Sequence, residues 1–188
     1  TFSTGLTYVT FAVRNNNSFP VTITDMSCLQ ANLYEDNVYS LFYSVTSLSG
    51  PPTVASPTWT LLSTSTAPIT VSVIGQVIPF KCIGLVIPAS TTYRFALQGS
   101  KGTAVRGASS PNIFSSGGVD LLVGDNASTG GQVGYFGWQN IGNSGLPYFF
   151  DGSITFAQAS AFTDVEIRKI IKPTTACSST SNTLMAEV

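Results

Sequence analysis

The residues of this sequence whose type and spacing could do chemistry are carboxylates beside glycine. Asp120, Asp125 and Asp151 lie in the strings GGVDLLVGDN (117–126) and FFDGS (149–153). Two acids across a cleft could cleave a glycosidic bond, and carboxylate oxygens are the ligands that Ca²⁺ prefers. An aspartate before glycine or asparagine is more often a turn residue that bonds its own backbone. Turn chemistry is therefore the leading interpretation of all three, and Ca²⁺ is the one cofactor that they could hold.

A second set of candidates combines aromatic rings with amides in the string WQNIGNSGLPY (138–148). A carbohydrate site uses flat rings as platforms and amides as polar contacts, and this loop holds Trp138, Gln139, Asn140, Asn143 and Tyr148. Aromatic residues make up 11% of the chain, however, and the core of a β-sandwich can bury most of them. Core packing is the first interpretation, for Trp59 as well, and a ligand-contacting loop is the alternative.

The three cysteines are too few for a disulfide scaffold and are wrongly spaced for zinc. Cys28 and Cys82 lie at the ends of strand-like runs, so a bridge between them and two free buried thiols are equally acceptable. Cys177 lies in a Ser/Thr-rich tail, where we expect it to be unpaired or bonded outside this chain.

Charge and histidine content exclude several functions. The 188 residues carry eight Lys and Arg against nine Asp and Glu, and no histidine. Without a basic excess we expect no nucleic-acid partner, and without histidine there is no Ser-His-Asp or Cys-His pair. No apolar run approaches the length that spans a bilayer, and no basic amphipathic stretch suggests a membrane surface. We therefore expect a protein that is not an enzyme and does not insert into a membrane.

The elements that must position these residues are strands. Runs of β-branched and aromatic residues alternate with Gly, Pro, Asn and Ser clusters, and no window carries a helical stripe. About eleven such runs predict an all-β fold, a two-sheet antiparallel β-sandwich of jelly-roll-like type, with a barrel as the alternative. The predicted strands are 6–13, 20–28, 39–45, 58–62, 69–74, 81–87, 92–97, 119–123, 134–138, 149–156 and 164–171.

The chain is predicted to form a single sandwich domain over residues 1–172. Residues 99–118 are polar and rich in Gly and Ser, which predicts a long surface loop with one short strand at most. Residues 173–188 form a Ser/Thr-rich tail or linker. Because the sequence begins at Thr1, we expect a processed protein or a segment of a longer one.

Five strings occur in an order that resembles a known module: FAVRNNNSFPVTITDM (11–26), LFYSVTSLSGPPTVASPTWTLL (41–62), LVIPASTTYRFALQGS (85–100), GGVDLLVGDN (117–126) and FDGSITF (150–156). Together they resemble the β-sandwich repeat of large secreted surface adhesins of Bacteroidetes, which serve gliding and attachment and are exported by the type IX system. The resemblance covers about residues 5–156. It implies an extracellular spacer, filament component or adhesive unit, and it carries over no catalytic residue.

The expected function is that of a non-catalytic structural or adhesive module at the cell surface, within a larger surface protein or an assembling filament. Its expected partners are other copies of itself or neighbouring domains, because a net charge of −1 does little to keep copies apart. The alternatives are a carbohydrate-binding module, with surface glycans as partners, and a virion capsid or spike jelly-roll subunit. The three cysteines and the expected strand 164–171 depart from the adhesin pattern and keep these alternatives open.

Overall fold

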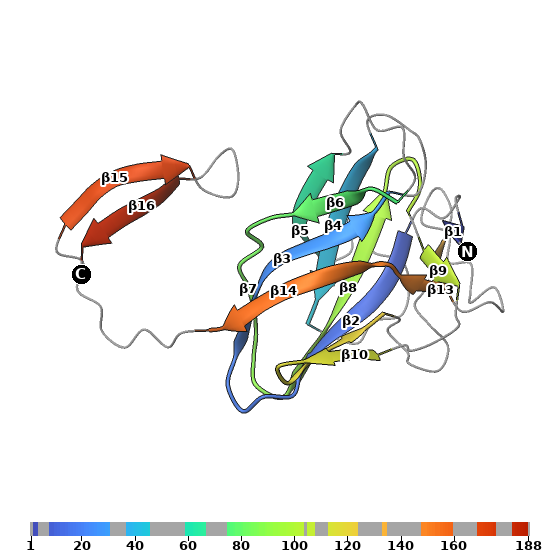
Figure 1. The fold of residues 1–188 in the computed structure, drawn as a ribbon, viewed down its shortest axis with the longest axis horizontal. Helices are drawn as coiled ribbons and strands as arrows, with labels where there is room; N and C mark the ends of the chain where they lie inside the picture. The colour runs from blue at the N-terminus through green and yellow to red at the C-terminus, as the bar shows by residue number, and fades with distance from the viewer. Residues whose placement is uncertain are drawn as a thin grey trace.

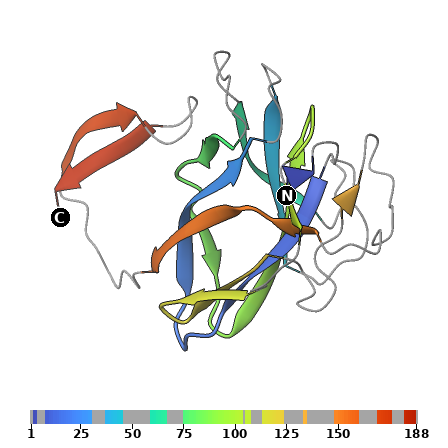
Figure 2. The same ribbon diagram turned by 45° about the vertical axis from the view of Figure 1, so that its right-hand side comes forward.

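The computed structural model describes residues 2–3, 8–30, 37–45, 59–66, 75–103, 105–107, 113–123, 133–134, 148–159, 169–175 and 182–187. Every regular element within these ranges is a β-strand. The strands form two main antiparallel sheets that pack as layers (Figures 1 and 2), so the predicted two-sheet antiparallel sandwich is confirmed.

The large sheet is built around the first long strand of the chain. Its strand order is β10 (Ile113–Ser116), β11 (Val119–Leu122), β2 (Tyr8–Asn15), β8 (Thr91–Gly99), β4 (Val38–Ser44) and β5 (Thr60–Thr66). The two-residue strand β12 (Val133–Gly134) also pairs with β2. Strands far apart in sequence therefore lie side by side, and β2 and β8 are matched over eight residues, from Tyr8 opposite Gln98 to Asn15 opposite Thr91.

The small sheet has the order β14 (Gly152–Gln158), β3 (Val21–Leu29) and β6 (Val77–Phe80), and β7 (Leu85–Ile87) also pairs with β3. The chain changes sheet at each of the connections β2–β3, β3–β4, β5–β6 and β7–β8. Such winding is found in jelly-roll and other Greek-key sandwiches. Two further sheets are minor: β1 (Phe2–Ser3), β9 (Val105–Gly107) and β13 (Tyr148–Phe150) form one, and β15 (Lys169–Thr175) and β16 (Asn182–Glu187) form the other.

Alternate residues of each strand fill the space between the two sheets. The ring of Phe11 stacks on Phe95 from the neighbouring strand and on Phe150, with ring centroids 5.3 and 4.0 Å apart. Val21 and Ile23 of β3 face the same core, whereas the interleaved threonines Thr22 and Thr24 are partly exposed. This period of two is the pattern that predicted the strands, because successive side chains of a strand point to opposite faces.

The outer face of the large sheet is also buried along β2 and β8. Thr10, Ala96 and Phe42 lie in one row across three strands, and Phe42 and Ala96 pack in a second cluster with Trp59. Trp59 is therefore buried, as expected, although its cluster is separate from the core between the sheets. The guanidinium of Arg94 lies 5.7 Å from the centre of the Trp59 ring. Burial lowers the pKa of Arg94 to about 10, while the nearby Tyr8 opposes this shift.

A buried asparagine fixes the crossing from β2 to β3. The Asn15 amide nitrogen donates to the carbonyl oxygens of Phe19 at 2.9 Å, Pro88 at 3.0 Å and Ile87 at 3.2 Å. Its side-chain oxygen accepts from the backbone N–H of Asn17 at 3.0 Å. One side chain thus forms hydrogen bonds with backbone groups of two loops at this end of the sandwich, which are not paired by hydrogen bonds between strands.

Several predicted elements differ from those observed. The predicted strand 81–87 is two strands, because Cys82 and Gly84 have φ of 55° and 67° and end the extended run. The predicted strand 149–156 is likewise divided at Asp151. The predicted loop 99–118 holds β9 and β10, and the boundary placed at residue 172 falls inside β15, whose partner β16 lies in the expected tail. Residues 69–74 and 160–168 lie outside the described residues.

Truncation of Phe11 should destabilise the sandwich more than truncation of any exposed ring. Phe11→Ala should lower the free energy of unfolding by about 3–5 kcal/mol, because it leaves a cavity between two stacked rings. Phe19→Ala is the matched control, since that ring is 36% exposed. Urea denaturation measures both variants, and equal midpoints for Phe11→Ala and wild type would contradict the assigned core.

Candidate functional site

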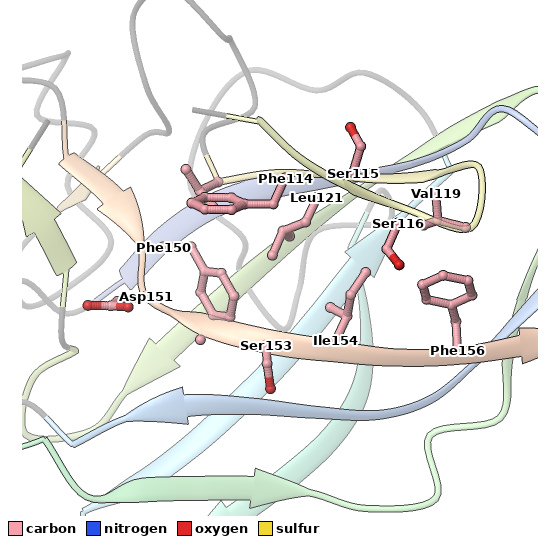
Figure 3. Close-up of a pocket in the computed structure, with 12 residues that line it drawn as sticks. Phe114, Ser115, Ser116, Val119, Leu121, Phe150, Asp151, Ser153, Ile154 and Phe156 are labelled. Atoms are coloured by element: carbon pink, nitrogen blue, oxygen red, sulfur yellow. The ribbon is translucent and has the colours of Figure 1, made fainter. Parts of the chain in front are cut away.

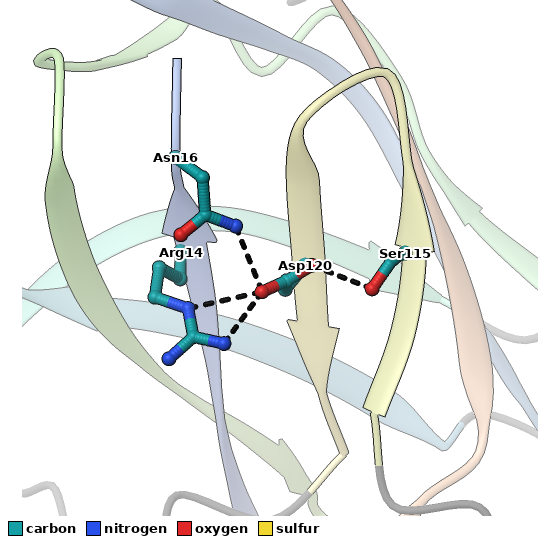
Figure 4. A network of polar contacts seen from close by, with 4 residues as sticks. All are labelled: Arg14, Asn16, Ser115 and Asp120. Atoms are coloured by element: carbon teal, nitrogen blue, oxygen red, sulfur yellow. Dashed lines mark hydrogen bonds and ion pairs between the residues drawn. The ribbon is translucent and has the colours of Figure 1, made fainter. Parts of the chain in front are cut away.

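Asp120 is the first predicted site residue that the structure places, and it belongs to a network of polar side chains on the outer face of the large sheet (Figure 4). Its carboxylate accepts from the Arg14 guanidinium at 2.6 and 3.0 Å, from the Asn16 amide at 2.8 Å and from the Ser115 hydroxyl at 2.6 Å. The Asp120 side chain is only 10% exposed. These bonds tie β10, β11 and the end of β2 together, and Asp120 lies in strand β11 rather than in the predicted turn.

The three carboxylates do not form one site among the described residues. Asp120 points away from the space between the sheets, whereas its neighbours Val119 and Leu121 point into that space, which Asp151 also borders. The Asp120 side chain thus lies on the outer face of the large sheet and Asp151 on the side of the space between the sheets, so these two carboxylates do not face each other across one cleft. Asp125 lies outside the described residues. Within the described part, no group of three or more Cys, Asp or Glu could hold a metal ion.

The aromatic and amide candidates for a carbohydrate site mostly fall outside the described residues. This holds for Trp138, Gln139, Asn140 and Asn143. Tyr148 is the first residue of β13 and lies opposite Gly107 of β9. Its neighbours Phe149 and Phe150 are buried in the core between the sheets. The core interpretation therefore holds for these two phenylalanines, and the sugar-contacting loop remains a prediction.

The cysteines match neither alternative in full, the Cys28–Cys82 bridge or two free buried thiols. Cys28 is a free, buried thiol on β3, while Cys82 is exposed and forms a disulfide. The two cannot be partners. Cys28 points into the core opposite Ile78 of β6, and burial raises the pKa of its thiol. Cys177 lies outside the described residues.

A pocket with a volume of about 340 Å³ opens between the edges of the two sheets (Figure 3). The side chains of Phe114, Leu121 and Val119 reach into it from the β10–β11 hairpin, and those of Ile154 and Phe156 reach into it from β14. Its full set of described lining residues is Phe114, Ser115, Ser116, Val119, Leu121, Val123, Phe150, Asp151, Gly152, Ser153, Ile154 and Phe156. We call this feature the open edge. Asp151, at one end, is its only charged lining residue in the described part of the chain.

Both strands that border the open edge are the outermost described strands of their sheets. β10 is the last strand of the large sheet and β14 the last strand of the small sheet, so each has one ladder partner among the described strands. Neither Ile113–Ser116 nor Gly152–Gln158 contains a charged residue. Ile113 and Phe114 remain 37% and 40% exposed. An edge strand beside an apolar pocket can bind an extended chain by strand addition.

Sequence reasoning missed the β10–β11 hairpin, although a signal for it was present. Gly117 and Gly118 have φ of 52° and 73° and form the two-residue turn between the strands. Such turns favour Gly-Gly because both central residues need positive φ. A Cβ at Gly118 would clash with the Asn17 side-chain amide, and the Asn16 backbone N–H donates to the Gly118 carbonyl at 2.8 Å. The asparagine loop after β2 thus holds the turn in place.

No known protein family, curated protein or solved structure matches the chain. Within the described residues, no helix has the length and hydrophobicity needed to cross a membrane.

The Asp120 network should make the stability of the fold depend on pH under acidic conditions. The hydrogen bond from Ser115, supported by Arg14 and Asn16, holds the pKa of Asp120 below its ordinary value. A depressed pKa contributes stability above about pH 4, and this contribution is lost as the pH falls through the folded-state value.

Asp120→Asn should therefore reduce the free energy of unfolding by about 1–2 kcal/mol at neutral pH and flatten its decline between about pH 5 and 3. Because Arg14 is 43% exposed, solvent screens part of this loss. Ser115→Ala should flatten the decline to a smaller degree. Urea titrations across this pH range test the series, and the same pH slope in wild type and Asp120→Asn would reject the assignment.

The thiol of Cys28 should be protected in the native protein. It should resist N-ethylmaleimide until the chain is unfolded, because it is buried and its pKa is raised. A non-reducing peptide map should recover Cys82 in a disulfide-linked peptide, and Cys177 is the cysteine that the sequence leaves to pair with it. A linked Cys28–Cys82 peptide would contradict the arrangement described above.

Proposed function

We propose that this chain is a non-catalytic structural module of the extracellular surface that assembles with other β domains through its open edge. The observation that supports this most is the apolar pocket between β10 and β14, two edge strands without a charged residue. Soluble proteins usually protect such edges with lysine, proline or a covering segment. A partner strand would satisfy the free backbone groups and cover the half-exposed rings of the pocket at once.

The composition of the chain supports assembly as well. With a net charge of −1 and 9% charged residues, copies repel each other little at long range. Two carboxylates lie near the open edge in the described structure. Asp120 binds Arg14 on the outer face of the sheet, away from the pocket, and Asp151 borders the pocket at one end. Contact along the uncharged strands β10 and β14 therefore requires little desolvation of charge.

The disulfide at Cys82 supports the extracellular part of the proposal. Disulfides persist in secreted and surface proteins and are rare where thioredoxin and glutathione keep thiols reduced. The resemblance to secreted surface adhesins implies the same compartment, and also implies a spacer, filament or adhesive role rather than catalysis.

The protein should self-associate at high concentration, and a charge at the open edge should weaken this association. Phe114→Lys should raise the dissociation constant at least tenfold, because association would bury an ammonium group in an apolar pocket. Val45→Lys is the matched control, since Val45 is 59% exposed and is not a lining residue of the pocket. Sedimentation velocity over a wide concentration range measures both variants.

Wild-type protein that stays monomeric at millimolar concentration would contradict assembly through copies of the chain. An equal loss of association in Phe114→Lys and Val45→Lys would show that the open edge is not the contact.

A further inference from the structure

We propose that the disulfide of Cys82 is a reducible clasp that holds the C-terminal hairpin β15–β16 to the sandwich. The chain has three cysteines and Cys28 is a free thiol, so Cys177 is the partner that remains for Cys82. Cys177 lies outside the described residues, and in the sequence it falls between the two strands of the hairpin. The bond therefore joins the connection between β6 and β7 to the hairpin. This inference goes beyond the proposed function, because it concerns contacts within one chain.

The hairpin is the part of the chain that depends most on such a bond. β15 and β16 pair with each other and with no other described strand, and Figures 1 and 2 show them apart from the two main sheets. Two-stranded hairpins are marginally stable in water unless a further strand or a packed face supports them. A cross-link to a folded domain favours the ordered hairpin, because it restricts the disordered alternatives. Loss of the bond should therefore loosen the hairpin first.

The sandwich side of the clasp is held in place without the disulfide. The Cys82 backbone N–H donates to Asp25 Oδ1 at 3.2 Å, and the Ile83 backbone N–H donates to the Thr24 carbonyl at 2.7 Å. Lys81 forms an ion pair with the same Asp25 oxygen at 3.9 Å. The strands on either side of this connection, β6 and β7, both pair with β3. Reduction should therefore leave this part of the sandwich unchanged.

The position of Cys82 suits a bond that opens and closes. Cys82 is exposed and has a φ of 55°, in the left-handed region that residues other than glycine rarely adopt. Such conformations persist where surrounding contacts fix them, and they cluster at functional sites. Exposed disulfides are accessible to thiols and exchange more readily than buried ones. Cys28, by contrast, is 1% exposed and lies opposite Ile78 in the core, so it is shielded from exchange with Cys82.

A dithiol, either a small molecule or a pair of cysteines in another protein, supplies the two electrons that open the clasp. One thiolate of the dithiol attacks the Cys82 sulfur, the bond to Cys177 breaks, and Cys177 leaves as a thiolate that takes up a proton. The second thiolate of the dithiol then attacks its own partner sulfur in the mixed disulfide, and Cys82 leaves and is protonated. The dithiol ends as a disulfide and the chain gains two thiols. The hairpin then remains attached through the polypeptide that follows β14.

A dithiothreitol titration of the native full-length chain tests the clasp. Alkylation after mild reduction should label Cys82 and Cys177 while Cys28 stays unlabelled. Hydrogen–deuterium exchange, read by mass spectrometry, should become at least about tenfold faster in β15 and β16 and change less than about twofold in β2 and β8. Replacement of dithiothreitol by oxidised glutathione should restore the slow exchange of the hairpin.

A pair of cysteine variants separates the clasp from other effects of the reductant. Cys177→Ser should show fast exchange in β15 and β16 without dithiothreitol, and dithiothreitol should add nothing further. Cys28→Ala is the matched control, because it removes a thiol and leaves the clasp intact. Its hairpin should exchange as slowly as in wild type until dithiothreitol is added. Thermal unfolding of both variants confirms that the sandwich is folded.

Three results would overturn the inference. Labelling of Cys28 at the same dithiothreitol concentration as Cys82 would show that the bond opens only when the sandwich unfolds. Equal exchange of the hairpin in wild type and Cys177→Ser would show that the bond does not hold it. A non-reducing peptide map that joins Cys82 to a cysteine of another copy would exclude a clasp within one chain. Because none of these readouts involves the open edge, failure of the clasp and failure of the proposed assembly are distinguished.

Discussion

The structure depends on the pairing of β2 with β8, two strands that are far apart in the sequence and largely buried on both faces. On the inner face the pair supplies Phe11 and Phe95 to the core between the sheets. On the outer face it presents Thr10, Ala12 and Ala96, which are small enough to be covered completely. A strand pair buried on both sides leaves few positions where a charge is tolerated, and this constraint explains much of the low charge of the chain. Arg94 is a charged residue on this buried outer face, and its lowered pKa shows that burial disfavours its charged form.

The two sides of the sandwich end differently. On one side β5 and β6 contact each other, so the edges of the two sheets close over the core. On the other side β10 and β14 stand apart, and Ile154 and Phe156 complete the core only in part. The network of Asp120 with Arg14 and Ser115 holds β10 and β11 to the large sheet from the outer face. The β10 side of the open edge is thus supported from the outer face of the large sheet.

Much of the fold could be predicted because alternation is a local property. Val21 and Ile23, or Phe95 and Leu97, reveal a strand and its buried face within a few residues. Interruptions of a strand are harder to predict when they depend on the backbone conformation of one residue. In the run 81–87, nothing in the sequence indicates that Cys82 adopts a positive φ. The partner of Asp120 was out of reach for another reason. Arg14 is 106 positions away, and a period of two does not encode which strands become neighbours. The open edge depends on which strands end the two sheets, and for the same reason it could not be predicted from the sequence.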